Sequence, residues 1–172
     1  MAAAALRVAV LGPGAEATPE ICALAGDVGR LLAERGAVVL TGGLGGVMAA
    51  AAEGATSAGG AAVGLLPGTD RAAGNEYSTI SIPTGLGEMR NALLIECADG
   101  IVSVGGSWGT LSEIALARRA DVPVVSLAGW SVLAADGCPL PLVTAASPDA
   151  AVRSVLELIA TRPGPEPGRM DR

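Results

Sequence analysis

Short unbroken apolar runs alternate along this sequence with longer stretches of helical spacing, and this alternation most constrains the fold. The runs predict strands over residues 6–11, 37–40, 61–66, 79–82, 100–104 and 122–127. Helices are expected over residues 18–35, 47–58, 84–98 and 148–160, with one more around Glu113 that ends near Asp121. Continuous apolar strands are typical of parallel sheets whose two faces are both covered. We therefore predict an α/β, Rossmann-like, doubly wound and mostly parallel sheet with helices on both faces.

The length of 172 residues suits one domain with a full buried core. We expect a single domain over residues 1–161. Residues 162–172 contain three prolines and charges of both signs, and they are predicted to form a flexible C-terminal tail. Residues 128–146 are ambiguous, and a short helix and an edge strand are considered for them.

Composition excludes several kinds of function. The net charge of −6 argues against a nucleic-acid partner, and all eleven basic residues are arginine, which removes lysine chemistry and the Walker lysine. No apolar run reaches the roughly 18 residues of a membrane span, and no basic segment precedes the first alanines. Three widely spaced cysteines without any histidine predict core thiols, no metal site and a cytoplasmic protein.

Glycine-rich turns follow four of the expected strands. They contain Gly12, residues 42–46, Pro67 with Gly68, and residues 105–109. In a doubly wound sheet such turns share one edge, where ligands bind near the topological switch point. Glycine enrichment in short loops explains one or two such turns but explains all four poorly. The pattern predicts a phosphate-bearing small molecule as the ligand.

The first turn also matches the dinucleotide pattern G-x-G-x-x-A over residues 12–17. That pattern requires a carboxylate at the end of the second strand, about 20 residues on, to hold a ribose. The second strand ends Val39-Leu40-Thr41-Gly42, with no acid. NAD is therefore not the expected ligand.

Residues 104–113 combine a strand end, a glycine turn and the beginning of a helix. Free N–H groups and the helix dipole make such a place an anion site. Glu113 is expected in the first turn of this helix, facing the ligand. Two plainer readings stay open: residues 110–113 fit the capping box S/T-x-x-E, and the glycines could serve only tight packing.

Arg90 is expected within an apolar helical stripe formed by Leu86, Met89, residues 93–94 and Cys97. A guanidinium among apolar neighbours requires a carboxylate or a phosphate as its partner. Alternatively, Arg90 reaches the helix edge or pairs with a structural acid.

These motifs, in this order, resemble the LOG (lonely guy) family, whose members have long carried the label of lysine decarboxylases. The resemblance covers roughly residues 6–128 and rests on residues 41–48, 59–67, 89–91 and 105–113. It implies a homodimer or higher homo-oligomer that cleaves nucleoside 5′-monophosphates, such as those of cytokinin ribosides, to free base and ribose 5-phosphate. Neither a metal nor a cofactor is implied.

By position, Glu113 and Arg90 resemble the catalytic glutamate and arginine of that family. An oxocarbenium-like transition state is stabilised by a carboxylate that also orients or deprotonates water. The expected phosphate- and nucleotide-binding residues are Gly12, Gly42, Gly43, Gly45, Gly46, Met48, Pro67, Asn91, Gly105, Gly106, Ser107, Gly109 and Thr110.

The sequence departs from the family pattern at two places, and both bear on whether the protein is catalytic or only binds its ligand. Residues 105–107 read Gly-Gly-Ser where the family has Pro-Gly-Gly, and Asn91 replaces a lysine after Arg90. Both variants resemble a bacterial branch that is similar to the molybdenum-cofactor carrier protein of algae, which binds a phosphorylated pterin without hydrolysis. We predict a phosphoribohydrolase, with a non-catalytic nucleotide or pterin carrier as the alternative.

Overall fold

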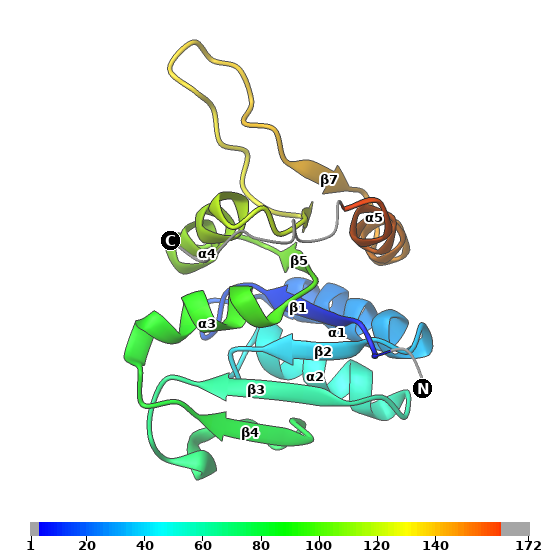
Figure 1. Ribbon diagram of the computed structural model, residues 1–172, viewed down its shortest axis with the longest axis vertical. Coiled ribbons are helices and arrows are strands. Elements are labelled where there is room, and N and C mark those ends of the chain that lie inside the picture. The colour runs from blue at the N-terminus through cyan, green and yellow to red at the C-terminus, as the bar shows by residue number, and fades with distance from the viewer. Residues whose placement is uncertain (1–3, 163–172) are drawn as a thin grey trace, which may run out of the picture.

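The computed structural model describes residues 4–162 and contains a seven-stranded sheet in the order β4-β3-β2-β1-β5-β6-β7 (Figure 1). Every neighbouring pair of strands is parallel. The strands are β1 (Arg7–Leu11), β2 (Val38–Thr41), β3 (Ala62–Leu66), β4 (Ile80–Pro83), β5 (Gly100–Val104), β6 (Val124–Leu127) and β7 (Val143–Ala145). The helices are α1 (Pro19–Glu34), α2 (Val47–Ser57), α3 (Arg90–Cys97), α4 (Trp108–Arg119) and α5 (Pro148–Thr161), with single 3₁₀ turns η1 (Arg71–Ala73) and η2 (Gly87–Met89).

Helices cover both faces of the sheet, and each face has its own core. Side chains of a strand alternate between faces. Val8 and Val10 accordingly lie in the core under α1, α2 and α5, whereas Ala9 and Leu11 lie in the core under α3 and α4. The predicted doubly wound α/β class is confirmed.

The sheet changes winding direction between β1 and β5. The chain proceeds outward from β1 to β4 and then returns to place β5 on the other side of β1. The turns after β1, β2, β3 and β5 therefore share one edge, as predicted. A Cβ atom on Gly12 would lie 2.4 Å from the carbonyl oxygen of Val104, so the first turn lies directly against the end of β5.

Helices α1 and α2 pack backbone against backbone. A Cβ atom on Gly29 would lie 2.0 Å from the carbonyl oxygen of Ala51, and one on Gly54 would lie 2.0 Å from that of Gly26. Only glycine permits this approach, because any side chain would collide with main-chain atoms that cannot move away separately. Gly29 of α1 and Gly54 of α2 thus set the spacing of the two helices.

The first helix begins and ends as its sequence predicts. The Thr18 hydroxyl caps it, Pro19 occupies its first position, and Gly36 follows its end with φ of +75°. The helix expected over residues 84–98 begins later than predicted. Gly85 and Gly87 both have positive φ, so only η2 and then α3 form there.

Residues 128–142 form an extended loop that projects from the sheet (Figure 1). The short helix considered for this region is absent from it, and the edge strand is β7. Pro139 and Pro141 have no N–H to donate, and Leu133 bridges Pro139 across the loop. Of the predicted tail over 162–172, only Arg162 is described and the rest lies outside the described residues. The single domain over 1–161 stays a prediction.

The cysteines differ from the expected core thiols. All three are free, but Cys22 and Cys97 are only half-buried and Cys138 is exposed on the projecting loop. Within residues 4–162, no helix has the length and apolar character that crossing a membrane requires.

The α1–α2 contact can be tested with two matched substitutions in one helix. We expect Gly29→Ala to lower the free energy of unfolding by at least about 1–3 kcal/mol, because its methyl group overlaps the backbone of Ala51. Gly26→Ala has its nearest contact at 3.6 Å and should be neutral or stabilise by about 0.5–1 kcal/mol. Urea denaturation measures both, and equal effects would contradict backbone-to-backbone packing.

Candidate anion-binding site

The N-terminus of α4 is formed by Ser107. Its hydroxyl accepts a hydrogen bond from the Thr110 N–H at 3.1 Å and lies 3.0 Å from the Thr110 hydroxyl. Gly105, with φ of +71°, turns the chain from β5 into this cap. The capping box considered for residues 110–113 is therefore not formed. Glu113 lies in the second turn of α4, not in the first as predicted, because the helix begins at Trp108.

Arg90 is buried, with 9% of its side chain exposed. Its position differs from the predicted stripe, since Leu86, Met89 and Leu93 are all exposed. The guanidinium instead reaches the turn after β2, where a Cβ atom on Gly42 would lie 2.5 Å from Nη2. Gly42 thereby leaves the room that this buried charge occupies.

The partners of Arg90 do not saturate its guanidinium. Nη1 donates to Oδ1 of Asn91 at 2.8 Å, and the same Nη1 lies 3.8 Å from Oε1 of Glu113. Nε is buried and has no hydrogen-bond partner within residues 4–162. The arginine is thus ion-paired but retains donor capacity for a further acceptor.

Burial dominates the electrostatics of this pair. It raises the pKa of Glu113 to about 7, and the nearby positive charge of Arg90 only partly opposes this rise. Burial also lowers the pKa of Arg90 from its usual value, again against the opposing effect of Glu113. Near neutral pH the Glu113 carboxyl is therefore able to hold or release a proton.

A cavity of about 470 Å³ connects α4, α3 and the turns after β1, β2 and β3. It brings together most of the predicted site residues: Gly12, Gly42, Met48, Pro67, Arg90, Asn91, Ser107, Gly109, Thr110 and Glu113. Sequence reasoning missed others on its wall: Gly14, Leu44, Gly87, Glu88 and Ser112. Two of these could have been found from sequence: Gly14 belongs to the G-x-G turn, and Glu88 lies two residues before Arg90, in segments already assigned to the site.

Five predicted glycines lie outside this lining. Gly43 and Gly46 have positive φ and shape the second turn, and a Cβ atom on Gly46 would lie 2.1 Å from the carbonyl oxygen of Gly14. Gly45 faces open space. Gly105 and Gly106 line a different, larger cavity on the other side of α4.

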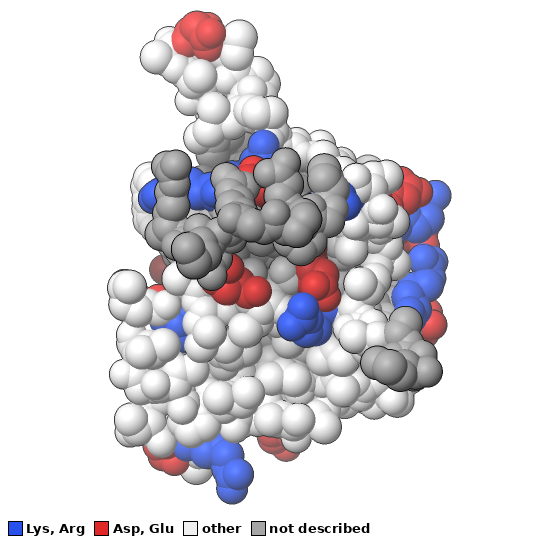
Figure 2. Space-filling model, viewed as in Figure 1, with Lys and Arg blue, Asp and Glu red and all other residues white. Residues whose placement is uncertain are grey.

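The cavity lined by Arg90 and Glu113, which we call the polar cavity, has a chemistry that favours an anion as its ligand. Unpaired N–H groups at the beginning of a helix and an arginine with a free donor bind phosphate or carboxylate oxygens. Figure 2 shows acidic and basic side chains interspersed on the viewed face, without a broad positive area for a polyanion. Within residues 4–162, no group of three or more His, Cys, Asp or Glu residues could hold a metal ion.

The parallel sheet and the glycine-lined cavity at its switch point define a Rossmann-like α/β protein with a candidate small-anion site. The chain belongs to the SLOG cluster4 family, whose model matches residues 5–152. An uncharacterized protein of Archaeoglobus fulgidus is 43% identical over 122 residues, which are 71% of this chain and 80% of that protein.

Two solved structures are similar over nearly the whole chain. The molybdenum cofactor binding protein of the phototrophic bacterium Rippkaea orientalis is 32% identical with a TM-score of 0.82, covering 92% of this chain and 99% of its own. The molybdenum cofactor carrier protein of Chlamydomonas reinhardtii is 32% identical with a TM-score of 0.79, covering 91% and 99%. The prediction of a LOG-like chain from the branch similar to molybdenum-cofactor carriers is confirmed.

The raised pKa of Glu113 predicts a pH-dependent stability. A folded-state pKa near 7 against an ordinary value of 4.5 means that the folded protein binds this proton more tightly than the unfolded chain. The stability of wild type relative to Glu113→Gln should therefore fall by about 3 kcal/mol as pH rises from 4.5 to 7, then stay level. Denaturation at several pH values measures the difference, and parallel curves would contradict the assignment.

Proposed function

We propose that this protein binds a phosphorylated heterocyclic small molecule, of the pterin type held by molybdenum-cofactor carriers. The observation that carries the proposal is the buried guanidinium of Arg90, whose Nε has no partner within residues 4–162 beside the beginning of α4. A phosphate there would receive hydrogen bonds from Arg90 and from the N–H groups of the turn.

The size and lining of the cavity support this proposal. Its volume of about 470 Å³ falls in the usual range of small-molecule pockets. Gly14 and Gly109 allow close approach of a ligand to the backbone, because a Cβ atom on either would have its nearest contact at 3.6 Å or beyond. The two solved relatives that bind or carry the molybdenum cofactor share this fold at 32% identity.

A second candidate function is hydrolysis of a nucleoside 5′-monophosphate, and Glu113 favours it. The residue is 8% exposed, and its carboxyl lies 3.8 Å from Nη1 of Arg90 and has a pKa of about 7. In this reaction the C–N glycosidic bond breaks and water adds to the ribose carbon. Glu113 takes the water proton, and the released base gains a proton.

We infer that the protein forms a homo-oligomer through the exposed side of η2 and α3, the helix that begins at Arg90. Leu86, Met89 and Leu93 are 49%, 72% and 38% exposed, which leaves an apolar surface beside the polar cavity.

The pterin proposal is tested by measuring whether a pterin stays bound to the protein through purification. Protein purified from a host that makes the molybdenum cofactor should yield, after oxidation with iodine, close to one fluorescent pterin per chain. Arg90→Met should lower this occupancy or the affinity for inorganic phosphate by about 10- to 100-fold, because a charged donor is lost.

Arg119→Met provides the matched control, since Arg119 is exposed in the last turn of α4. It should retain the wild-type pterin content. Equal losses in both variants would show that Arg90 does not contact the anion, and circular dichroism checks that both are folded.

The hydrolase candidate is tested with a panel of nucleoside monophosphates, measuring free base by chromatography. An enzyme should release base, and Glu113→Gln should slow release by about 100- to 10,000-fold while ligand affinity changes little. The value of kcat/KM, which reports the ligand-free protein, should rise with pH through about 7, because only the ionised carboxyl accepts the water proton. Retained pterin with no release from any monophosphate would leave the carrier function and reject hydrolysis.

A further inference from the structure

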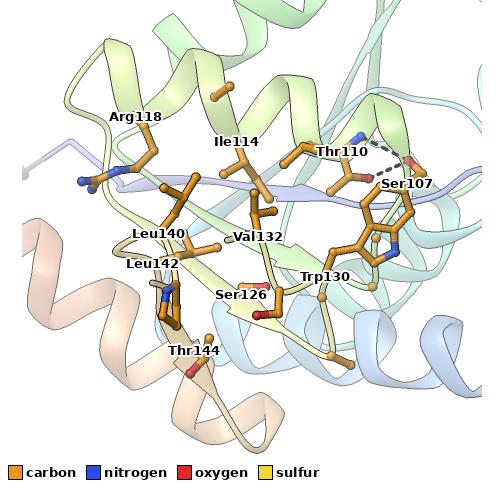
Figure 3. Close-up of a pocket in the computed structure, with 18 of the residues that line it drawn as sticks. Ser107, Thr110, Ile114, Arg118, Ser126, Trp130, Val132, Leu140, Leu142 and Thr144 are labelled. Carbon is orange, nitrogen blue, oxygen red and sulfur yellow. Dashed lines mark hydrogen bonds between the residues drawn. The ribbon is translucent and has the colours of Figure 1, made fainter. Parts of the chain in front are cut away.

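A second cavity, which we call the apolar cavity, lies on the opposite flank of α4 beneath the projecting loop (Figure 3). Its volume is about 670 Å³, enough for a drug-sized molecule. Helix α4 and the loop after β6 supply most of its wall: Leu111, Ile114, Trp130, Val132, Leu140 and Leu142. It shares only Ser107 and Thr110 with the polar cavity.

Ser126 places one polar group among these apolar side chains. It lies on β6, is 4% exposed and lines the cavity between Trp130 and Thr144 (Figure 3). Its hydroxyl is therefore a hydrogen-bonding group on the wall of the cavity, next to apolar side chains. A ligand with one hydrogen-bonding group can pair with this hydroxyl, and a net hydrogen bond of this kind contributes about 0.5–1.5 kcal/mol, which is about 2- to 10-fold in affinity.

Trp130 forms a flat and fixed wall. A Cβ atom on Gly106 would lie 2.4 Å from Cδ1 of the indole, so the ring packs directly against this glycine. Trp108 holds it from another side, edge to face, with ring centroids 5.2 Å apart. Trp130 is still 45% exposed, which leaves part of the ring free to stack on a ligand.

The charge of the lining restricts the ligand. Arg118 is the sole ionisable residue among the described residues that line the apolar cavity. It lies at one end, and its guanidinium points away from the other lining residues (Figure 3). A charged molecule would lose its hydration here without gaining a partner.

We propose that the apolar cavity binds an uncharged planar molecule of about two or three rings that carries one hydrogen-bonding group for Ser126. The ring stacks on Trp130 and the aliphatic side chains enclose its edges. This site is separate from the anion site, because Glu113 and Arg90 do not line it.

The uncharged fluorophore N-phenyl-1-naphthylamine is a suitable probe. It should bind saturably with one molecule per chain, and its emission should rise in the apolar surroundings. Trp108 and Trp130 are the two tryptophans of the chain, so energy transfer from protein to probe reports binding beside them.

Three substitutions locate the bound probe. Ala115 lines the cavity from an exposed position of α4, so Ala115→Phe should fill its mouth and weaken binding at least tenfold. Leu140→Asp places a charge on the exposed loop within the lining and should have a similar effect. Leu133→Ala changes an exposed loop residue outside the lining and should bind the probe like wild type.

Ser126→Ala tests the hydrogen bond separately. It should weaken 1-naphthol by about 2- to 10-fold but leave naphthalene unaffected, since only naphthol has a partner for the hydroxyl. Arg90→Met should retain probe binding, so loss of the anion site and loss of the apolar site are distinguishable.

The proposal fails if the wild type does not bind the probe, including the case in which a second copy of the chain covers the cavity. It also fails if Ala115→Phe and Leu140→Asp both bind like Leu133→Ala.

Discussion

The parallel direction of all seven strands is the constraint on which the candidate site depends. Their carboxyl ends lie on one edge, so turns that are distant in sequence meet there. The reversal between β1 and β5 separates the helices above these turns and leaves the beginning of α4 accessible. The glycine turns then bring backbone N–H groups to the same place. Ligand chemistry at this edge follows from strand direction before any particular side chain is considered.

Arg90 and Glu113 place two ionisable groups at that edge, and their interaction only partly offsets the cost of burying them. A separation of 3.8 Å gives attraction between charges without a short hydrogen bond, and Asn91 takes one of the guanidinium donors. The pair therefore stays receptive to a third, anionic group. A bound phosphate would compete with Glu113 for Arg90 and favour the protonated carboxyl, so binding near neutral pH would be accompanied by proton uptake.

Much of the fold could be predicted from sequence because local and tertiary preferences agree there. Apolar runs gave six of the seven strands to within about two residues, and Thr18 with Pro19 marked the beginning of α1. Residues 107–113 contain three serine or threonine residues; the capping box was expected at Thr110, but Ser107 caps α4. The loop at 128–142 has neither strand nor helix periodicity, so its projection and the cavity beneath it had no sequence signal. The contact of Arg90 with Gly42 joins residues far apart in sequence, which no local pattern reveals.

The backbone contact of α1 with α2 has a consequence for how relatives of this protein could diversify. An enlarged side chain at position 29 or 54 would separate the helices, and with them the turns that meet at Gly14 and Gly46. Single changes on this face of the sheet thus disturb the frame of the site without offering the ligand a new contact. The opposite face, with α3, α4 and the projecting loop, carries exposed side chains such as Met89, Leu116 and Leu133, which could be replaced without moving the frame. Changes in ligand choice would therefore be easier to make on the α3 and α4 side of the sheet than on the α1 and α2 side.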